Sequence, residues 1–172
     1  MPTIRRMRTL AATPEEIWAI VADPHHMPRW WPRVKRVESV DEDGFTQVLT
    51  TNKGESVRAD FRVLESAPPT VRRWAQELSG TPFERILTLS ETEIRLERSG
   101  ERTRVVVSRA QRLRGLARFG SFMVSRASAR QLDDALSGLE ALVRYVLHRG
   151  RHGRQLASSR SVEGRCTSDV LG

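Results

Sequence analysis

The fold is decided by the stretch from Phe119 to Leu147, which reads FGSFMVSRASARQLDDALSGLEALVRYVL. Its later apolar residues recur at alternating steps of four and three, which is the spacing of one face of an α-helix. This stripe consists of Leu132, Leu136, Leu139, Val143 and Val146. At 1.5 Å per residue, a helix of about 28 residues is about 42 Å long. We predict one long C-terminal helix that traverses a whole sheet.

The chain between Val34 and Leu113 has a different pattern, in which short apolar segments are separated by turn-forming pairs such as Asp43-Gly44. In the third segment apolar and charged residues alternate, which gives a strand one apolar face for the core and one charged face for the solvent. The apolar face carries Val57, Ala59, Phe61 and Val63. We predict a run of antiparallel strands covered by the long helix, an arrangement that tends to enclose a pocket. The predicted strands are residues 34–41, 45–52, 55–66, 70–78, 83–98 and 103–113.

Before these strands, the sequence predicts one N-terminal strand and two short helices. The sequence TPEE at residues 13–16 is a helix start, because Thr13 can act as N-cap and Glu16 can close a capping box. Asp23-Pro24 ends this helix and can cap a second one. The aromatic pair Trp30-Trp31 lies at the exit of the second helix, where the chain turns towards the sheet.

The length of 172 residues and the hydrophobic content of 38% fit one domain with one core. We predict that this domain spans residues 1–147. Residues 148–172 are rich in arginine, glycine and serine and lack apolar periodicity, which is typical of disordered segments. We predict that they form a basic, disordered tail.

The start of the chain does not resemble a secretory signal, and no apolar run approaches the ~20 residues needed to cross a bilayer. We therefore expect a soluble, cytoplasmic protein without integral membrane association. The single cysteine, Cys166, excludes an internal disulfide and a cysteine-built metal site. His25 and His26 are adjacent, so their side chains diverge and do not chelate one ion together. We expect no metal site, and the absence of a nucleotide-binding glycine motif gives no reason to expect a cofactor.

The formal net charge of +8 raises the possibility of a nucleic-acid partner. The arginines, however, are scattered among acidic residues along the whole chain, and Lys35 and Lys53 are the only lysines. This distribution is more typical of a compositional bias than of a binding stripe. Binding to RNA or to a ribosome through a basic surface is the alternative hypothesis.

Three segments carry a resemblance to a known family: ATPEEIW at 12–18 with VADP at 21–24, PRWWPRV at 28–34, and GERTRVVV at 100–107. Over about residues 1–147 the chain resembles the START-like (SRPBCC) superfamily, in particular its polyketide cyclase/dehydrase and lipid-transport branch. The resemblance implies an α+β helix-grip fold. In this fold a curved antiparallel sheet wraps around a long C-terminal helix, and two short helices follow the first strand.

The resemblance also implies a deep cavity between the long helix and the concave face of the sheet. Matched by position, the residues after the second short helix border its mouth, and aromatic residues at the start of the long helix line the opposite wall. Strand aromatics can complete the concave side, although each of these residues could instead be plain core. The candidate ligand-binding residues are Trp30, Trp31, Phe61, Trp74, Phe119, Phe122 and Met123.

The leading hypothesis is therefore binding of a hydrophobic or aromatic small molecule, polyketide-like or lipid-like, in an internal cavity. A second hypothesis is an enzyme of the cyclase/aromatase type that uses the same cavity, for which no matching catalytic motif can be carried over. Arg126 on the long helix could bind a carboxylate or phenolate if it turned inward, and is otherwise a surface residue.

Overall fold

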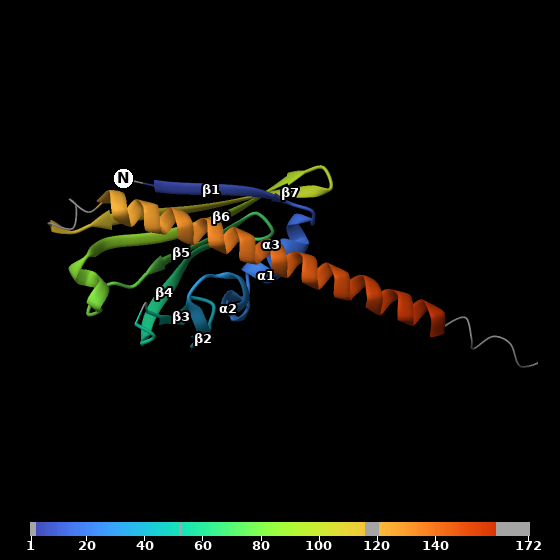
Figure 1. The fold of residues 1–172 in the computed structure, drawn as a ribbon, viewed down its shortest axis with the longest axis horizontal. Helices are drawn as coiled ribbons and strands as arrows, with labels where there is room; N and C mark the ends of the chain where they lie inside the picture. The colour runs from blue at the N-terminus through green and yellow to red at the C-terminus, as the bar shows by residue number, and fades with distance from the viewer. Residues whose placement is uncertain (1–2, 52, 116–120, 161–172) are drawn as a thin grey trace, which may run out of the picture.

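The computed structural model describes residues 3–51, 53–115 and 121–160 of the chain. The predicted strands form one seven-stranded antiparallel sheet in the order β1-β7-β6-β5-β4-β3-β2 (Figure 1). The sheet thus joins the first and last strands of the chain side by side, and β2 lies at the opposite edge. The strands are β1 (Thr3–Leu10), β2 (Val34–Glu38), β3 (Gly44–Thr50), β4 (Ser56–Ala67), β5 (Val71–Gln76), β6 (Leu87–Ser99) and β7 (Arg102–Leu113).

Strand boundaries differ from the prediction where local turn chemistry competes with strand pairing. β2 ends at Glu38 because Ser39 has a positive φ of 49°, and the Asp41 carboxylate accepts hydrogen bonds from the amides of Asp43 and Gly44. The segment predicted to begin a strand at Phe83 instead forms the 3₁₀ helix η2 (Pro82–Arg85), and β6 starts after it. Pro82 fixes φ and supplies no N–H for a strand ladder.

The short helices after β1 are α1 (Pro14–Val21), the 3₁₀ helix η1 (Pro24–His26) and α2 (Met27–Trp30). The capping box of α1 is present: the amide of Glu16 donates to Thr13 Oγ1, and the Glu16 carboxylate accepts from the amide of Thr13. Asp23 caps the next segment by accepting from the amide of His25. These caps satisfy amide groups that a helix start otherwise leaves without partners.

The long helix α3 (Ser121–Arg160) crosses the concave face of the sheet (Figure 1). Leu132, Leu136, Leu139 and Val143 are buried, so this part of the predicted stripe packs in the core. Val146, the last residue of the predicted stripe, is 45% exposed and does not belong to the core. The helix continues beyond Leu147 to Arg160. The domain boundary at Leu147 remains a prediction, and residues 161–172 lie outside the described part of the chain.

One glycine allows α3 to approach α2 closely. A Cβ atom at Gly138 would lie 2.5 Å from the Trp30 carbonyl oxygen and 3.0 Å from the Trp30 Cα. Real Cβ atoms do not approach a backbone that closely, so the contact requires glycine in the middle of a helix, where it otherwise costs about 1 kcal/mol relative to alanine. The packing of α3 on α2 fixes the position of the helix over the sheet.

Candidate ligand-binding cavity

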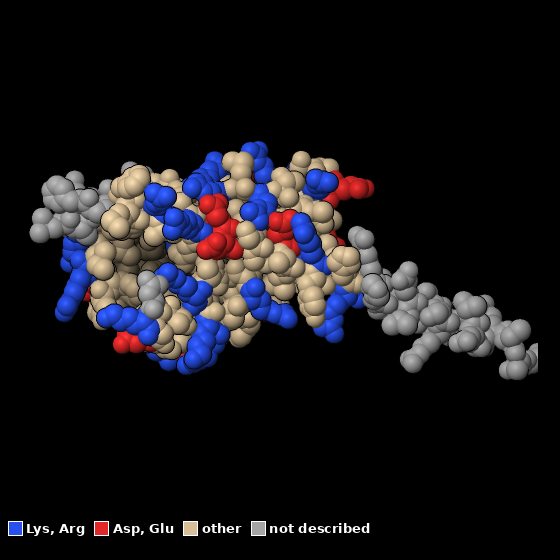
Figure 2. Space-filling view, in the orientation of Figure 1, with Lys and Arg blue, Asp and Glu red and all other residues tan. Residues whose placement is uncertain are grey.

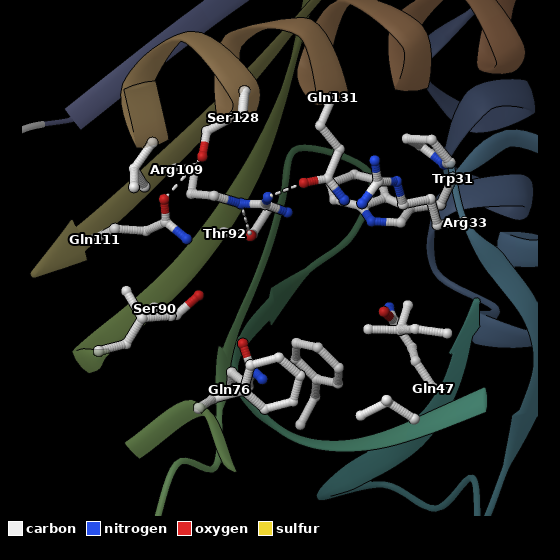
Figure 3. Close-up of a pocket in the computed structure, with 18 of the residues that line it drawn as sticks. Trp31, Arg33, Gln47, Gln76, Ser90, Thr92, Arg109, Gln111, Ser128 and Gln131 are labelled. Carbon is white, nitrogen blue, oxygen red and sulfur yellow. Dashed lines mark hydrogen bonds between the residues drawn. The ribbon is translucent and has the colours of Figure 1, made fainter. Parts of the chain in front are cut away.

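A cavity of about 720 Å³ lies between the first half of α3 and the concave face of the sheet. The apolar core fills the space under Leu132 to Val143, whereas the cavity extends under Val124, Ser128 and Gln131. Figure 3 shows side chains converging on it from α3, from β6 and β7, and from the segment around β2 and β3. The volume is within the range of about 300–1,000 Å³ typical of small-molecule sites.

Aromatic rings form part of the wall. Trp31, Phe61 and Trp74 line the cavity, and Phe83 of η2 joins them. The ring centroids of Trp31 and Trp74 are 5.8 Å apart in an edge-to-face arrangement, and Phe61 stacks on Phe45 at 5.3 Å. Such contacts stabilise aromatic pairs beyond area burial alone. The rings are therefore held by the core and present fixed surfaces to the cavity.

Polar side chains form another part of the wall, beside apolar residues such as Leu49, Val57 and Leu87. Ser128 Oγ donates to Gln111 Oε1 at 2.8 Å, and Gln47 Nε2 donates to Met27 Sδ at 3.1 Å. Ser90 is 9% exposed and directs its side chain towards the cavity (Figure 3). The polar wall consists of Gln47, Gln76, Ser90, Thr92, Gln111, Ser128 and Gln131. Amide and hydroxyl groups of this kind can both donate to and accept from a ligand.

Arg109 on β7 is the least exposed of the charged residues that line this cavity. Its Nε donates to Thr92 Oγ1 at 3.3 Å, and its Nη1 donates to Gln131 Oε1 at 2.5 Å (Figure 3). The guanidinium carbon lies 5.4 Å from the centroid of the Trp31 ring, a cation–π distance. Removal from water lowers the pKa of Arg109 to about 10, which leaves the side chain protonated at neutral pH.

Three further charged residues line the cavity on its solvent-exposed side. They are Arg33, Arg130 and Asp134. Arg33 adopts a positive φ of 68°, and its carbonyl accepts from the amide of Thr50 at 2.9 Å. This bond ties the turn after α2 to β3 and holds the segment that carries Trp31.

Comparison with known proteins agrees with this architecture. The family model for polyketide cyclase/dehydrase and lipid transport matches residues 1–144. The chain belongs to this family. No curated protein matches the sequence.

Solved structures of the same superfamily share the fold of this family member. An aromatase/cyclase, Zhui from Streptomyces sp. R1128, has a TM-score of 0.70 at 17% identity, with 83% of this chain and 93% of that chain covered. The di-domain ARO/CYC BexL of the BE-7585A biosynthetic pathway has a TM-score of 0.72 at 23% identity, with coverage of 86% and 48%. A START superfamily protein from Mycobacterium smegmatis has a TM-score of 0.65 at 18% identity, with coverage of 84% and 98%. The predicted helix-grip fold is confirmed.

The structure separates the candidate residues predicted from sequence into two groups. Trp31, Phe61 and Trp74 lie on the cavity wall. Trp30 is 3% exposed and is not a wall residue, because its backbone lies under Gly138. Phe122 and Met123 are 74% and 76% exposed and are not part of the wall either. Phe119 lies outside the described residues. Ligand contact by any of these residues remains a prediction.

Sequence reasoning missed Arg109 and the polar wall. It assigned a carboxylate or phenolate to Arg126 on the condition that this residue turns inward, but Arg126 is exposed. The sequence did contain a pattern that predicts their inward orientation. Arg109 and Gln111 continue the alternation of the inward-facing Val105 and Val107 on β7.

Among the described residues, no helix is long and apolar enough to cross a membrane. Within the same residues, no three histidine, cysteine or acidic side chains are grouped so as to hold a metal ion.

Proposed function

We propose that this family member binds an aromatic, oxygen-rich small molecule of polyketide-like character in the cavity under α3. The observation that carries the proposal is the combination of aromatic rings and neutral hydrogen-bonding groups in one cavity of about 720 Å³. Flat rings can pack against Trp31 and Phe61, while carbonyl and hydroxyl groups of the ligand can bond to the glutamines and serines.

The polar wall favours such a ligand over a plain lipid chain. An alkyl chain placed against Gln76, Ser90 and Gln111 would remove these groups from water without giving them hydrogen-bond partners. Each such loss costs roughly 1–3 kcal/mol. A ligand with several oxygen atoms avoids this cost and still buries its rings.

Binding is also better supported than catalysis. Ring closure with loss of water needs groups that transfer protons near neutral pH, usually histidine, a carboxylate or tyrosine. Among the described residues that line the cavity, Asp134 is the only one of these types, and it is exposed. The cyclase hypothesis rests on the family and not on a recognisable catalytic group.

The basic surface does not favour the RNA-binding alternative. On the face in Figure 2, lysine and arginine side chains are spread over the surface with acidic residues between them. Several arginines of the described chain form ion pairs, such as Arg6 with Asp133 at 3.1 Å and Arg98 with Glu15 at 2.8 Å. Paired charges release fewer counterions from a phosphate backbone than a free basic stripe would.

A cavity-filling variant tests the proposal. Ser90→Phe adds a ring that points into the cavity and removes no hydrogen bond recorded for the Ser90 side chain. The matched control, Glu97→Phe, adds the same ring to the exposed face of the same strand. The probe is neutral 1,8-dihydroxyanthraquinone, followed by quenching of tryptophan fluorescence, because Trp31 and Trp74 line the cavity.

We expect saturable quenching at one site in the wild-type protein and in Glu97→Phe, with at least a tenfold loss of affinity in Ser90→Phe. Equal binding by Ser90→Phe would place the probe outside the cavity and contradict the proposal. Native mass spectrometry of gently purified protein then identifies any retained natural ligand, which should be aromatic and oxygen-rich.

A further inference from the structure

Arg109 is an enclosed cation without a protein counter-charge. Its two hydrogen-bond partners, Thr92 and Gln131, are both neutral. Among the described residues, no carboxylate lies within ion-pairing distance of it, and desolvation alone accounts for its lowered pKa. Exposed arginines of the same chain, such as Arg95 and Arg98, do pair with glutamates. Arg109 thus combines burial with partners that carry no charge.

The guanidinium is held in a fixed orientation. Bonds from Nε and Nη1 attach it to β6 and to α3, and the Trp31 ring lies against it. A guanidinium has five N–H donors in one plane, and the two recorded bonds leave donors directed to the cavity (Figure 3). A planar acceptor with two oxygens matches such a fork better than a single carbonyl oxygen does.

The charge of the cavity wall also favours an anionic ligand. Three arginines and one aspartate line the cavity. Arg33, Arg130 and Asp134 are exposed, so the charge that a neutral ligand would leave enclosed is that of Arg109. A single negative charge on the ligand would offset the inner arginine.

We infer that the ligand is an aromatic carboxylic acid whose carboxylate binds Arg109 while its rings pack near Trp31 and Phe61. This inference rests on the proposed function, since it specifies the class of molecule that the same cavity takes. It predicts a selectivity that ring packing alone does not, namely discrimination between an acid and its uncharged amide of the same size.

The test uses anthracene-2-carboxylate and anthracene-2-carboxamide, which share one ring system and differ by one charge. Both are titrated at pH 7.5 and low salt by isothermal calorimetry. A charged hydrogen-bonded pair is worth roughly 1.5–3 kcal/mol, so we expect the carboxylate to bind at least about tenfold more tightly. In Arg109→Gln this preference should disappear, with little change in the affinity for the amide. The control Arg104→Gln removes an exposed arginine from the outer face of the same strand and should keep the preference.

A second variant keeps the inference testable if Arg109→Gln fails to fold. Gln131→Glu is nearly isosteric and places a carboxylate on the Nη1 atom that Gln131 already contacts. This internal counter-charge should abolish the acid preference while the amide still binds.

The possible results separate the two proposals. Equal affinity for the two probes in the wild-type protein, or a preference that survives both Arg109→Gln and Gln131→Glu, overturns the inference and leaves the proposed function standing. Failure of both probes to bind, or binding that Ser90→Phe does not weaken, counts against the proposed function itself.

Discussion

Replacing Arg109 with methionine is expected to stabilise the folded protein, although it removes two hydrogen bonds. Burial lowers the pKa of Arg109 from its ordinary value to about 10, which corresponds to about 3 kcal/mol of unfavourable free energy for the charged form in the folded state. Against this stands the cation–π contact with Trp31, worth about 1–2 kcal/mol when shielded from water. Thr92 and Gln131 lose their donor, but both line the cavity. The net gain is then about 1 kcal/mol.

The unfavourable free energy of the buried Arg109 charge depends on pH in a definite direction. Because the pKa of Arg109 is lower in the folded than in the unfolded state, the unfolded chain holds the proton more tightly. The destabilisation by the buried charge is therefore complete below about pH 10, and it decreases as the pH rises from there towards the ordinary pKa of an arginine. At neutral pH the wild-type protein carries the full penalty, and Arg109→Met removes it.

The assay is urea denaturation at pH 7.5 followed by circular dichroism. A gain of about 1 kcal/mol should raise the urea concentration at the midpoint by roughly 0.3–1 M, because the free energy of unfolding falls by about 1–3 kcal/mol per M urea. Arg104→Met on the outer face should change the free energy of unfolding by less than about 0.5 kcal/mol. If Arg109→Met lowered the free energy of unfolding by more than about 1 kcal/mol, the reasoning would be refuted. The contacts of Arg109 would then stabilise the protein by more than its desolvation costs.

Three other variants test the packing and the boundaries of the domain. Gly138→Ala should lower the free energy of unfolding by about 1–3 kcal/mol because its methyl group meets the Trp30 backbone; a stabilised variant would mean that α3 is not so close to α2. Thr13→Ala should cost about 1 kcal/mol through loss of the capping box, measured in the same urea assay, whereas an unchanged midpoint would show that the cap is not needed. A chain that ends at Leu147 should keep the wild-type free energy of unfolding, since Tyr145 and Val146 are already exposed; loss of cooperative unfolding would contradict the predicted boundary.

Periodicity was sufficient to predict the order of the elements, because burial forces one face of each to be apolar. The stripe from Leu132 to Val143 and the alternation in β4 both lie where the patterns predicted. Element ends were less accurate, since a single backbone choice such as the positive φ of Ser39 decides them.

Neighbouring aromatic residues were harder to assign than whole elements. Trp30 and Trp31 are adjacent and equally apolar, yet one supports α3 and the other lines the cavity. Which of them faces the cavity depends on the exact rotation of a four-residue helix, α2, and a hydrophobic pattern does not fix that rotation. Phe122 and Met123 were assigned to the wall because they lie where the long helix begins, but they precede Val124, at which the inward face of α3 starts.

The cavity lies where the inward-facing residues of β7 and of α3 change from apolar to polar. On β7 the inward positions run from Val105 and Val107 to Arg109 and Gln111. On α3 the stripe, followed backwards from Leu132, continues at helical spacing through Ser128, with Gln131 beside it.

The two polar stretches meet in space, where Arg109 bonds to Gln131 and Gln111 accepts from Ser128. A strand and a helix that both become polar at the same end cannot close a dry core there, because buried polar groups need partners. Part of that need is met by the two bonds between the elements. The remaining polar groups of the wall are left to bond to a ligand. Among them, the N–H donors of Arg109 that face the cavity carry a positive charge, which an uncharged ligand would not neutralise.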